Sequence, residues 1–410
     1  MNINIPLSLY IHIPWCIKKC PYCDFNSYAQ KDILPEKEYI DALIQDLDQD
    51  LFIQDAIQND CDKRPFTSIF FGGGTPSLFS GKSIEAILNA VAKRYPFSSD
   101  IEITLEANPG TIEHTPFQDY RLAGVNRISL GAQSFQDDKL KALGRVHQAQ
   151  ETHQAIESIQ KANFNSYNID LMYGLPDQTL EDARFDLETA LQYSPPHLSW
   201  YNLTLEPNTI FHHQPPSLPD EDILWDIQNM GFDILAARGF NHYEVSAFSE
   251  PGFECQHNLN YWQFGDYIGI GAGAHGKITR LNLNSSSSLH SSSNSSSNSN
   301  SKWIIQRTAK TRFPKNYLET KKNNTFNTNL RSLSEQDIIF EFMLNNLRLA
   351  KGFSLELFEQ RTGLAFSLLE HMIKKARSKD LLCFQNNQFQ TTELGRRFLN
   401  DLISLFLPEK

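Results

Sequence analysis

The stretch "SLYIHIPWCIKKCPYC", Ser8 to Cys23, joins an apolar run to three closely spaced cysteines. Its first six residues are rich in β-branched and aromatic side chains, which predicts a buried strand. Cys16, Cys20 and Cys23 follow in a loop without a nearby fourth cysteine. A strand that ends in a cluster of reactive side chains is typical of α/β proteins, whose sites form at the carboxyl ends of the strands.

The same pattern recurs along the first half of the chain. Further apolar runs lie at residues 68–74, 102–108, 127–134, 167–174 and 199–207. Segments at 36–51, 83–95 and 179–193 separate them and carry apolar residues at the three- and four-residue spacing of a helix. Because strands alternate with helices, we expect a parallel sheet, and six such units predict an α/β fold with a partial (β/α)6 barrel.

The chain divides into four segments by composition. Residues 1–281 are expected to form the barrel and its extension, and the Ser/Asn-rich tract at 282–302 is expected to be a disordered insertion. Residues 303–329 are interpreted as a connector. Residues 330–410 show helical periodicity and a hairpin pattern, which predicts a winged-helix-like helical C-terminal domain.

Composition excludes several classes of function. The net charge of −11 offers no broad basic surface to a nucleic acid, so we expect no nucleic-acid partner. No apolar run approaches the roughly 20 residues of a transmembrane helix, and the N-terminus lacks a charged leader. We therefore expect a cytoplasmic protein, with a peripheral position at the inner face of the membrane as the alternative.

The cysteine spacing separates three kinds of site. Six cysteines in 410 residues do not make a disulfide framework. Structural zinc usually takes four ligands in two short pairs, and Cys61, Cys255 and Cys383 are isolated. Three thiolates spaced C-x3-C-x2-C instead suit a 4Fe–4S cluster, one per chain, and leave one iron open. S-adenosylmethionine can chelate that iron, and its reductive cleavage gives a 5′-deoxyadenosyl radical.

Several ordered motifs carry a family resemblance. They are "CIKKCPYC", "FGGGTPS", "EANPG", "RISLGAQSF", "GRVH" and "NIDLMYGLP", and together they cover the first half of the chain. In this order they resemble the oxygen-independent coproporphyrinogen III oxidase-like group of radical SAM proteins. The resemblance implies that the three clustered cysteines hold the 4Fe–4S cluster.

The resemblance also implies an S-adenosylmethionine site. Its residues would be Tyr10, Gly73, Gly74, Thr75, Glu106, Gln133, Arg145 and Asp170. A glycine run allows a ligand to approach the backbone closely. Arg145 suits a carboxylate and Asp170 suits ribose hydroxyls. Some of these residues line a second cosubstrate in the decarboxylating members, so the division between the two sites stays open.

Two features separate this chain from the decarboxylases. Those enzymes carry a further cysteine two residues after the third cluster cysteine, and here that position is Phe25. The segment "CQHNLNYWQFGDYIGIGAGAHG" contains an H-N-x-x-Y-W motif, which resembles the mark of HemW-type haem chaperones. The motif residues are His257, Asn258, Tyr261 and Trp262. A histidine beside two aromatics could give an axial iron ligand and an apolar wall for a porphyrin.

Other thiols and histidines carry weaker patterns. Cys255 is interpreted as a buried free thiol, with a second haem or redox ligand as the alternative. His275, in a glycine turn, is interpreted as structural.

The resemblance therefore implies a chaperone that binds haem as cargo and delivers it to haem-containing respiratory proteins, some of them membrane-associated. A homodimer is left open. The alternative is an oxygen-independent coproporphyrinogen III oxidase, a radical decarboxylase of propionate side chains, and Phe25 disfavours that enzymatic activity. A zinc-stabilised binding module is the third class, and the cysteine spacing argues against it.

Overall fold

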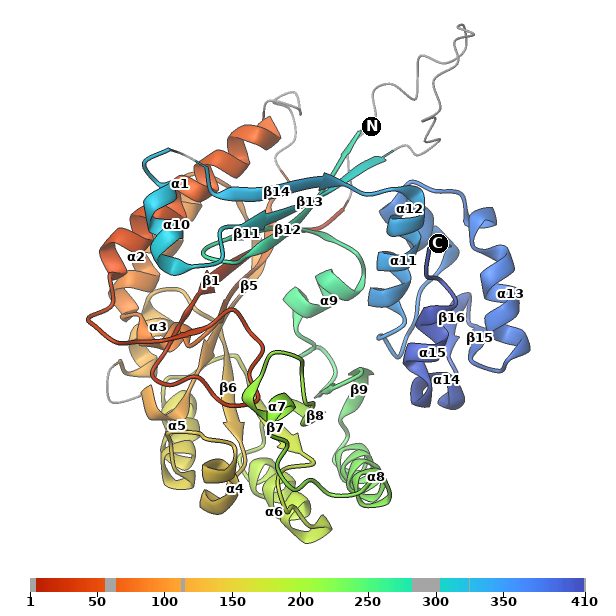
Figure 1. Ribbon diagram of the computed structural model, residues 1–410, viewed down its shortest axis with the longest axis horizontal. Coiled ribbons are helices and arrows are strands. Elements are labelled where there is room, and N and C mark those ends of the chain that lie inside the picture. Colours follow the sequence, from red (N-terminus) through yellow and green to blue (C-terminus); the bar gives the residue numbers. More distant parts are fainter. Residues whose placement is uncertain (1–4, 56–63, 112–114, 282–302, 324, 409–410) are drawn as a thin grey trace, which may run out of the picture.

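The computed structural model describes residues 5–55, 64–111, 115–281, 303–323 and 325–408 (Figure 1). The Ser/Asn-rich segment at 282–302, predicted to be disordered, lies outside the described residues.

One large sheet organises the barrel. The sheet has 12 strands in the order β14-β13-β12-β11-β1-β4-β5-β6-β7-β8-β10-β9. The six predicted strands are β1 (Leu7–Ile13), β4 (Phe66–Gly73), β5 (Phe97–Ala107), β6 (Arg127–Gln133), β7 (Ser166–Tyr173) and β8 (His197–Asn202). They are parallel neighbours in chain order, which confirms the predicted partial barrel. β11 (Asp266–Ile270) adds a seventh parallel strand beside β1.

Helices cover the outside of this sheet (Figure 1). Those that follow the parallel strands are α1 (Glu36–Asp55), α2 (Gly81–Ala92), α3 (Phe117–Leu122), α4 (Asp137–Ala142), α5 (Ala149–Lys161), α6 (Leu180–Leu191) and α8 (Glu221–Ala237). The short α7 (Ile210–His213) instead lies beside the cysteine loop, where the Phe211 N–H donates to the Pro21 carbonyl oxygen at 3.0 Å. The short 3-10 helices η1 (Pro76–Leu78) and η2 (Pro109–Thr111) follow β4 and β5. Side-chain caps such as Ser80, Thr179 and Asp220 satisfy free backbone N–H groups at the starts of α2, α6 and α8.

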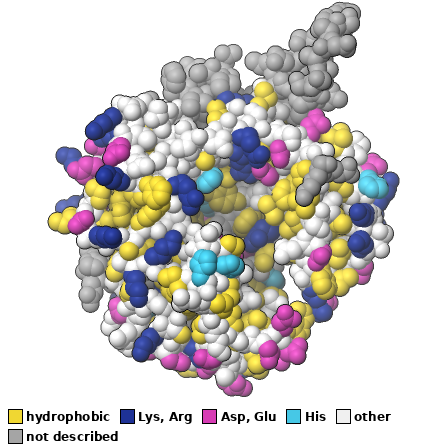
Figure 2. Space-filling view, in the orientation of Figure 1, with side chains coloured by type: hydrophobic (Ala, Val, Ile, Leu, Met, Phe, Trp, Pro, Cys, Tyr) yellow, Lys and Arg dark blue, Asp and Glu magenta, His cyan; other side chains and the backbone are white. Residues whose placement is uncertain are grey.

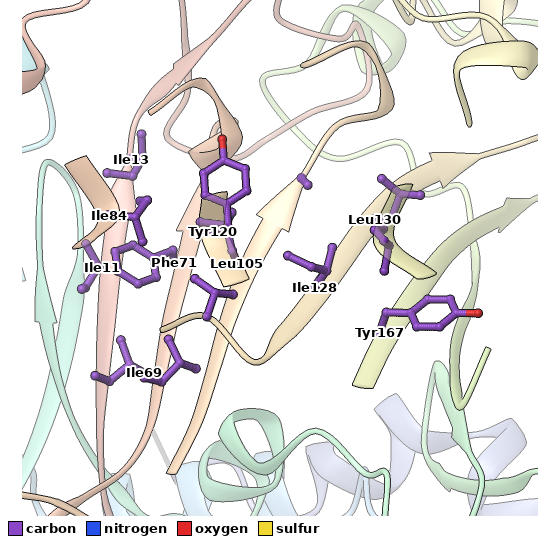
Figure 3. Close-up of a cluster of buried hydrophobic side chains, with 14 of the residues drawn as sticks. Ile11, Ile13, Ile69, Phe71, Ile84, Leu105, Tyr120, Ile128, Leu130 and Tyr167 are labelled. Carbon is purple, nitrogen blue, oxygen red and sulfur yellow. The ribbon is translucent and has the colours of Figure 1, made fainter. Parts of the chain in front are cut away.

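The outward side chains of the strands form the main hydrophobic core. Pairing aligns Ile11, Phe71, Leu105, Ile128 and Tyr167 in one row across five strands. Figure 3 shows these side chains packed together with residues of α2 and α3. Because side chains alternate along a strand, the residues between them face the barrel interior.

The inward row is largely polar, unlike the outward one. Pairing aligns Glu106, Ser129, Asn168 and His197. Burial of polar groups is costly unless they are hydrogen-bonded, so a polar interior indicates a site and not a core.

Antiparallel strands extend both edges of the sheet. They are β9 (Asn241–Glu244), β10 (Ala247–Ser249), β12 (His275–Leu281), β13 (Trp303–Lys310) and β14 (Asn327–Ser332). The small pair β2 (Trp15–Cys16) and β3 (Tyr28–Ala29) brackets the cysteine loop. The expected connector at 303–329 thus contributes β13, α10 (Pro314–Thr320) and the start of β14 to the extension.

A helical unit follows β14 and has its own hydrophobic core. It contains α11 (Glu335–Asn346), α12 (Leu355–Thr362), η4 (Phe366–Leu368), α13 (Glu370–Ser378), β15 (Leu382–Gln385), β16 (Gln388–Thr391), α14 (Glu393–Arg397) and α15 (Leu399–Ser404). The hairpin β15–β16 lies where it was expected. Leu402, Ile403 and Phe406 are buried in this core, whereas Leu407 is exposed.

Two lysines of the extension, one buried and one exposed, form ion pairs with α1. Lys310 on β13 contacts Asp46 at 2.6 Å and Asp50 at 2.7 Å, and all three side chains are buried. Lys321 contacts Asp41 at 3.2 Å, and both side chains are exposed. The buried group therefore fixes the extension to the barrel, because charges away from water need their partners.

We expect Lys310→Ala to lower the free energy of unfolding by ~3–5 kcal/mol, because two carboxylates would stay buried without their cation. The matched control Lys321→Ala removes an exposed pair and is expected to cost ~0–1 kcal/mol. Urea unfolding of both variants measures the difference, and equal losses would contradict the assignment of Lys310 as the anchor.

Candidate functional site

A cavity of about 340 Å³ lies at the carboxyl ends of the parallel strands. Its wall brings together the cysteine loop and the polar face of the sheet. The predicted residues that line it are Cys16, Cys20, Cys23, Gly73, Gly74, Thr75, Glu106, Gln133, Arg145 and Asp170. Tyr10 is the one residue predicted for the cluster or S-adenosylmethionine that is not part of this wall among the described residues.

The cysteine loop is clamped to the barrel by residues that the sequence did not single out. Asn26 donates hydrogen bonds to the carbonyl oxygens of Ala272 and Arg312, both at 2.9 Å. The Nε2 of His12 lies 2.9 Å from the Asn26 carbonyl oxygen, so that nitrogen carries the proton. The Nδ1 of His12 then accepts from the Tyr10 hydroxyl at 2.9 Å. Through these hydrogen bonds, Tyr10 and His12 of β1 position the cysteine loop.

The three cysteines suit a cluster better than a single metal ion. All three carry free thiols and face the same cavity. Within the described ranges, no three His, Cys, Asp or Glu side chains converge closely enough to hold one ion. In a cubane, by contrast, each thiolate binds a different iron. Burial raises the pKa of Cys16 and of Cys23, so cluster binding has to displace protons from these thiols.

The glycine run after β4 has a packing role. A Cβ on Gly73, whose φ is +118°, would lie 2.6 Å from the His12 ring. A Cβ on Gly74 would lie 2.5 Å from the Trp15 carbonyl oxygen. Close packing against His12 and Trp15 thus requires both glycines, in addition to the ligand contact that the family resemblance implies. Their backbone still lines the cavity.

Two carboxyl groups form the inner wall of the cavity. Glu106 accepts a hydrogen bond from the Gly73 N–H at 3.1 Å. Burial, with the charge of Asp170 nearby, raises the pKa of Glu106 to about 8. Asp170 accepts from Ser129 at 3.1 Å and from Asn168 at 2.7 Å, and burial also raises its pKa. These oxygens can accept hydrogen bonds from hydroxyl or ammonium groups of a ligand.

Arg145 supplies a buried positive charge on the opposite side. Its guanidinium donates to the Gly131 carbonyl oxygen at 2.8 Å and lies 3.8 Å from the Cys20 sulfur. Gln133, at a φ of +70°, accepts from the Tyr201 hydroxyl at 2.7 Å. A cation beside the cysteine loop and carboxyl groups across from it can orient a zwitterionic ligand.

A second cavity of about 220 Å³ lies deeper in the barrel. Glu106, Ser129 and Asp170 line both cavities, so they form a shared partition. On its other side the deep cavity is walled by α9 (Gln256–Trp262), which fills the inside of the open barrel (Figure 1). Tyr10 belongs to this deep cavity.

His257 on α9 is only 1% exposed and faces the deep cavity. Its Nδ1 lies 3.0 Å from the Ser68 hydroxyl, which donates its own hydrogen to Ser8. Nδ1 is therefore the donor, and Nε2 keeps a lone pair with no hydrogen-bond partner among the described residues. Burial and the charge of Arg127 lower the pKa of His257 to about 3, so the ring is neutral at physiological pH.

Aromatic rings surround this imidazole. Phe70 stacks on it with ring centroids 5.0 Å apart, Tyr261 packs edge-on at 4.7 Å, and Tyr10 lies at 6.3 Å. Asn258 and Tyr261 line the same cavity. A neutral imidazole with a free Nε2 among aromatic rings is a competent iron ligand.

Trp262 lies on the other side of α9. It lines a different cavity, of about 200 Å³, together with Phe264 and Asn345. The guanidinium of Arg348 lies 4.4 Å from its ring centroid. Trp262 therefore does not line the deep cavity with His257 and Asn258, whereas Tyr261 lines both cavities.

Asn260 occupies an unspecified position of the motif H-N-x-x-Y-W and was not predicted as a site residue, yet it anchors α9. Its side-chain amide donates to the Ser8 hydroxyl and to the Asp266 carbonyl oxygen, both at 2.8 Å. Together with the contact between His257 and Ser68, these bonds attach the helix to β1 and β4.

The remaining candidates are placed as follows. Cys255 is a buried free thiol 3.6 Å from a Glu102 carboxylate oxygen. His275 is exposed at the start of β12. Phe25 lines the 340 Å³ cavity beside the cysteine loop, and 60% of this residue is exposed.

Two protein-family models match the chain. The model of the Radical SAM superfamily matches residues 10–189, and the model of the HemN C-terminal domain matches residues 333–398.

Several full-length relatives are named as heme chaperones. "Heme chaperone HemW" of Haemophilus influenzae is 47% identical over 406 residues, which cover 99% of each chain. The protein of that name in Escherichia coli is 46% identical, over 98% of this chain and 99% of its own. The one in Bacillus subtilis is 31% identical, over 98% and 99%.

A solved structure shares the fold. Coproporphyrinogen III oxidase (HemN) from Escherichia coli superposes with a TM-score of 0.76 at 22% identity, covering 99% of this chain and 91% of that chain.

We expect Cys20→Ser to remove most of the bound iron and acid-labile sulfide from anaerobically reconstituted protein, because three thiolates are needed to retain the cluster. Cys383→Ser, in the β15–β16 hairpin, is the matched control and should keep the full content. Chemical iron and sulfide analysis measures both, and unchanged content in Cys20→Ser would contradict the assignment.

Proposed function

The chain belongs to the family of heme chaperones HemW, and we propose on that premise that it binds haem and delivers it to haem-containing proteins. His257 is the proposed iron ligand, with Asn258 and Tyr261 lining the site. The observation that carries this assignment is the Nε2 of the neutral His257 ring, which has no hydrogen-bond partner in the described part of the chain. It lies in a cavity that three aromatic rings share with polar side chains of the strands.

The deep cavity constrains how haem is bound. Its volume of about 220 Å³ lies below the roughly 300–1,000 Å³ of typical ligand sites, so a whole porphyrin does not fit as it stands. α9 spans seven residues and is joined to the strands through a few side-chain hydrogen bonds. We therefore expect α9 to move away from the strands when haem binds.

The protein also carries a 4Fe–4S cluster and binds S-adenosylmethionine, as radical SAM membership implies. We assign the cluster to Cys16, Cys20 and Cys23. When bound together, the two groups can supply a 5′-deoxyadenosyl radical. Glu106 and Asp170 would accept hydrogen bonds from S-adenosylmethionine, and Arg145 would hold its carboxylate.

The proposed acceptors are respiratory haem proteins, including membrane-associated ones. The proposed location is the cytoplasm, and a peripheral position at the inner face of the membrane is the alternative. Free thiols at five described cysteines support a reducing compartment. In the described residues, no helix combines the length and apolarity needed to span a bilayer. Analytical ultracentrifugation with and without the cluster would determine whether the protein forms a homodimer.

A haem titration followed by absorption spectroscopy tests the haem site. We expect His257→Ala to weaken binding by about tenfold or more, ~1.4 kcal/mol, and to shift the Soret band, because the axial nitrogen is lost. His371→Ala, which removes an exposed histidine on α13, is the matched control. An unchanged spectrum and affinity in His257→Ala would exclude this residue as the ligand.

Delivery needs a separate assay. Haem-loaded protein should restore the activity of an apo-respiratory haem enzyme more completely than the same amount of free haem in the presence of a haem scavenger. Equal restoration would refute delivery and leave only storage.

The decarboxylase alternative makes an opposite prediction. Because Phe25 replaces the further cysteine, we expect no protoporphyrinogen from coproporphyrinogen III under anaerobic conditions with S-adenosylmethionine and a reductant. Product analysis by chromatography measures this. Turnover would establish the enzymatic function despite Phe25.

A further inference from the structure

A separate cavity of about 290 Å³ lies where the barrel meets the C-terminal helical unit. Its barrel side is formed by α8 and β9, and its other side by the end of α11 and by α14, which face each other in Figure 1. The chain is tied together here, since the Ala350 N–H donates to the Tyr243 carbonyl oxygen at 3.0 Å. We call it the interface cavity. Figure 2 shows the same face of the molecule hollowed near its centre, in the region of α9.

The interface cavity has an aromatic wall that is open to solvent. Trp225 on α8 is 39% exposed, and Phe232 lies two turns further along the same helix. Val245 and Leu399 extend the apolar surface. Exposed apolar surface in a concave site marks a binding site, and flat aromatic rings there suit a planar ligand.

Charged groups of both signs, with one arginine in excess, surround this wall. Three arginines and two carboxylates line the interface cavity. Arg397 stacks over Trp225 at 4.4 Å and pairs with Glu393 within its own helix. Arg396 is exposed, and no ion pair is recorded for it among the described residues. Guanidinium groups bind carboxylates in a bidentate manner, so a carboxylate-bearing ligand fits this edge.

Arg348 connects the interface cavity to α9. Its guanidinium lies 3.9 Å from Glu244 on β9 and 4.4 Å from the Trp262 ring on α9. One Nε hydrogen of Arg348 is buried without a partner in the described part of the chain. A ligand carboxylate would compete with Glu244 for Arg348. It would thereby alter the contact between the Arg348 guanidinium and the Trp262 ring of α9.

We propose that the interface cavity is a second, surface-accessible binding site for a planar tetrapyrrole, whose ring lies against Trp225 and Phe232 and whose carboxylates meet Arg396 and Arg348. This inference rests on the proposed haem function. The interface cavity, at about 290 Å³, is also smaller than a typical ligand site, so part of the ring would project from it into solvent beside the exposed Trp225. Occupation of this site acts on α9 through Arg348.

Metal-free protoporphyrin IX is the probe, because it lacks the iron that His257 would bind. Titration of the full-length protein, followed by quenching of tryptophan fluorescence and by porphyrin fluorescence, gives the Kd. We expect Arg396→Gln and Trp225→Leu each to weaken binding about fivefold or more, through lost charge-assisted bonds and lost ring contact. Both side chains are exposed, and unchanged thermal unfolding midpoints would verify the fold.

Two controls locate the probe. Arg377→Gln removes an exposed arginine of α13 in the same unit and should leave the Kd unchanged. His257→Ala should retain protoporphyrin binding. Equal affinity in Arg396→Gln, Trp225→Leu and the parent protein would overturn the inference, as would loss of protoporphyrin binding in His257→Ala.

The outcome separates the two proposals. Haem binding that depends on His257 without any protoporphyrin binding would overturn the second site and keep the first. Protoporphyrin binding that depends on Trp225 and Arg396, without a haem spectrum that depends on His257, would keep the interface cavity and overturn the His257 assignment.

Discussion

The alternation of side chains on the parallel strands is the constraint on which the rest of the structure depends. Ile11, Phe71 and Leu105 face outward and pack against helices, so their neighbours in sequence face inward. Outward burial of apolar surface stabilises the sheet, and the inward positions are then free to carry polar groups. Glu106 and Asp170 occupy such positions. The polar interior therefore exists because the core lies outside the barrel.

The sequence predicted the parts that depend on local pattern. Strands β1 and β4–β8 follow from apolar runs, and their carboxyl ends had to meet at one edge of a parallel sheet. For that reason the residues predicted around Cys16 and Asp170 line one cavity. Alternation along β1 places Tyr10 and His12 on the same face as Ser8, which points into the barrel. The sequence could therefore also have predicted His12 as an inward-facing residue.

Contacts distant in sequence could not be predicted in the same way. β11 joins the sheet beside β1 through pairing that no local pattern encodes. Asn26 reaches residues 272 and 312, and Gly74 is needed because of the Trp15 carbonyl group. The motif around His257 could be recognised in the sequence, but not that its residues form a helix. That helix places Trp262 on a different side from His257. Helical periodicity over seven residues was too short a signal to assign those faces.

Glu106, Ser129 and Asp170 separate the two barrel cavities by a single layer of side chains. A group bound on one side that changes the charge or hydrogen bonding of these carboxyls changes the free energy of binding on the other. Thermodynamic linkage requires this effect to be equal in both directions. Binding in the deep cavity therefore changes the affinity of the cavity beside the cysteine loop by the same factor. A wall one residue thick is thus a reciprocal thermodynamic contact between two sites that share no ligand.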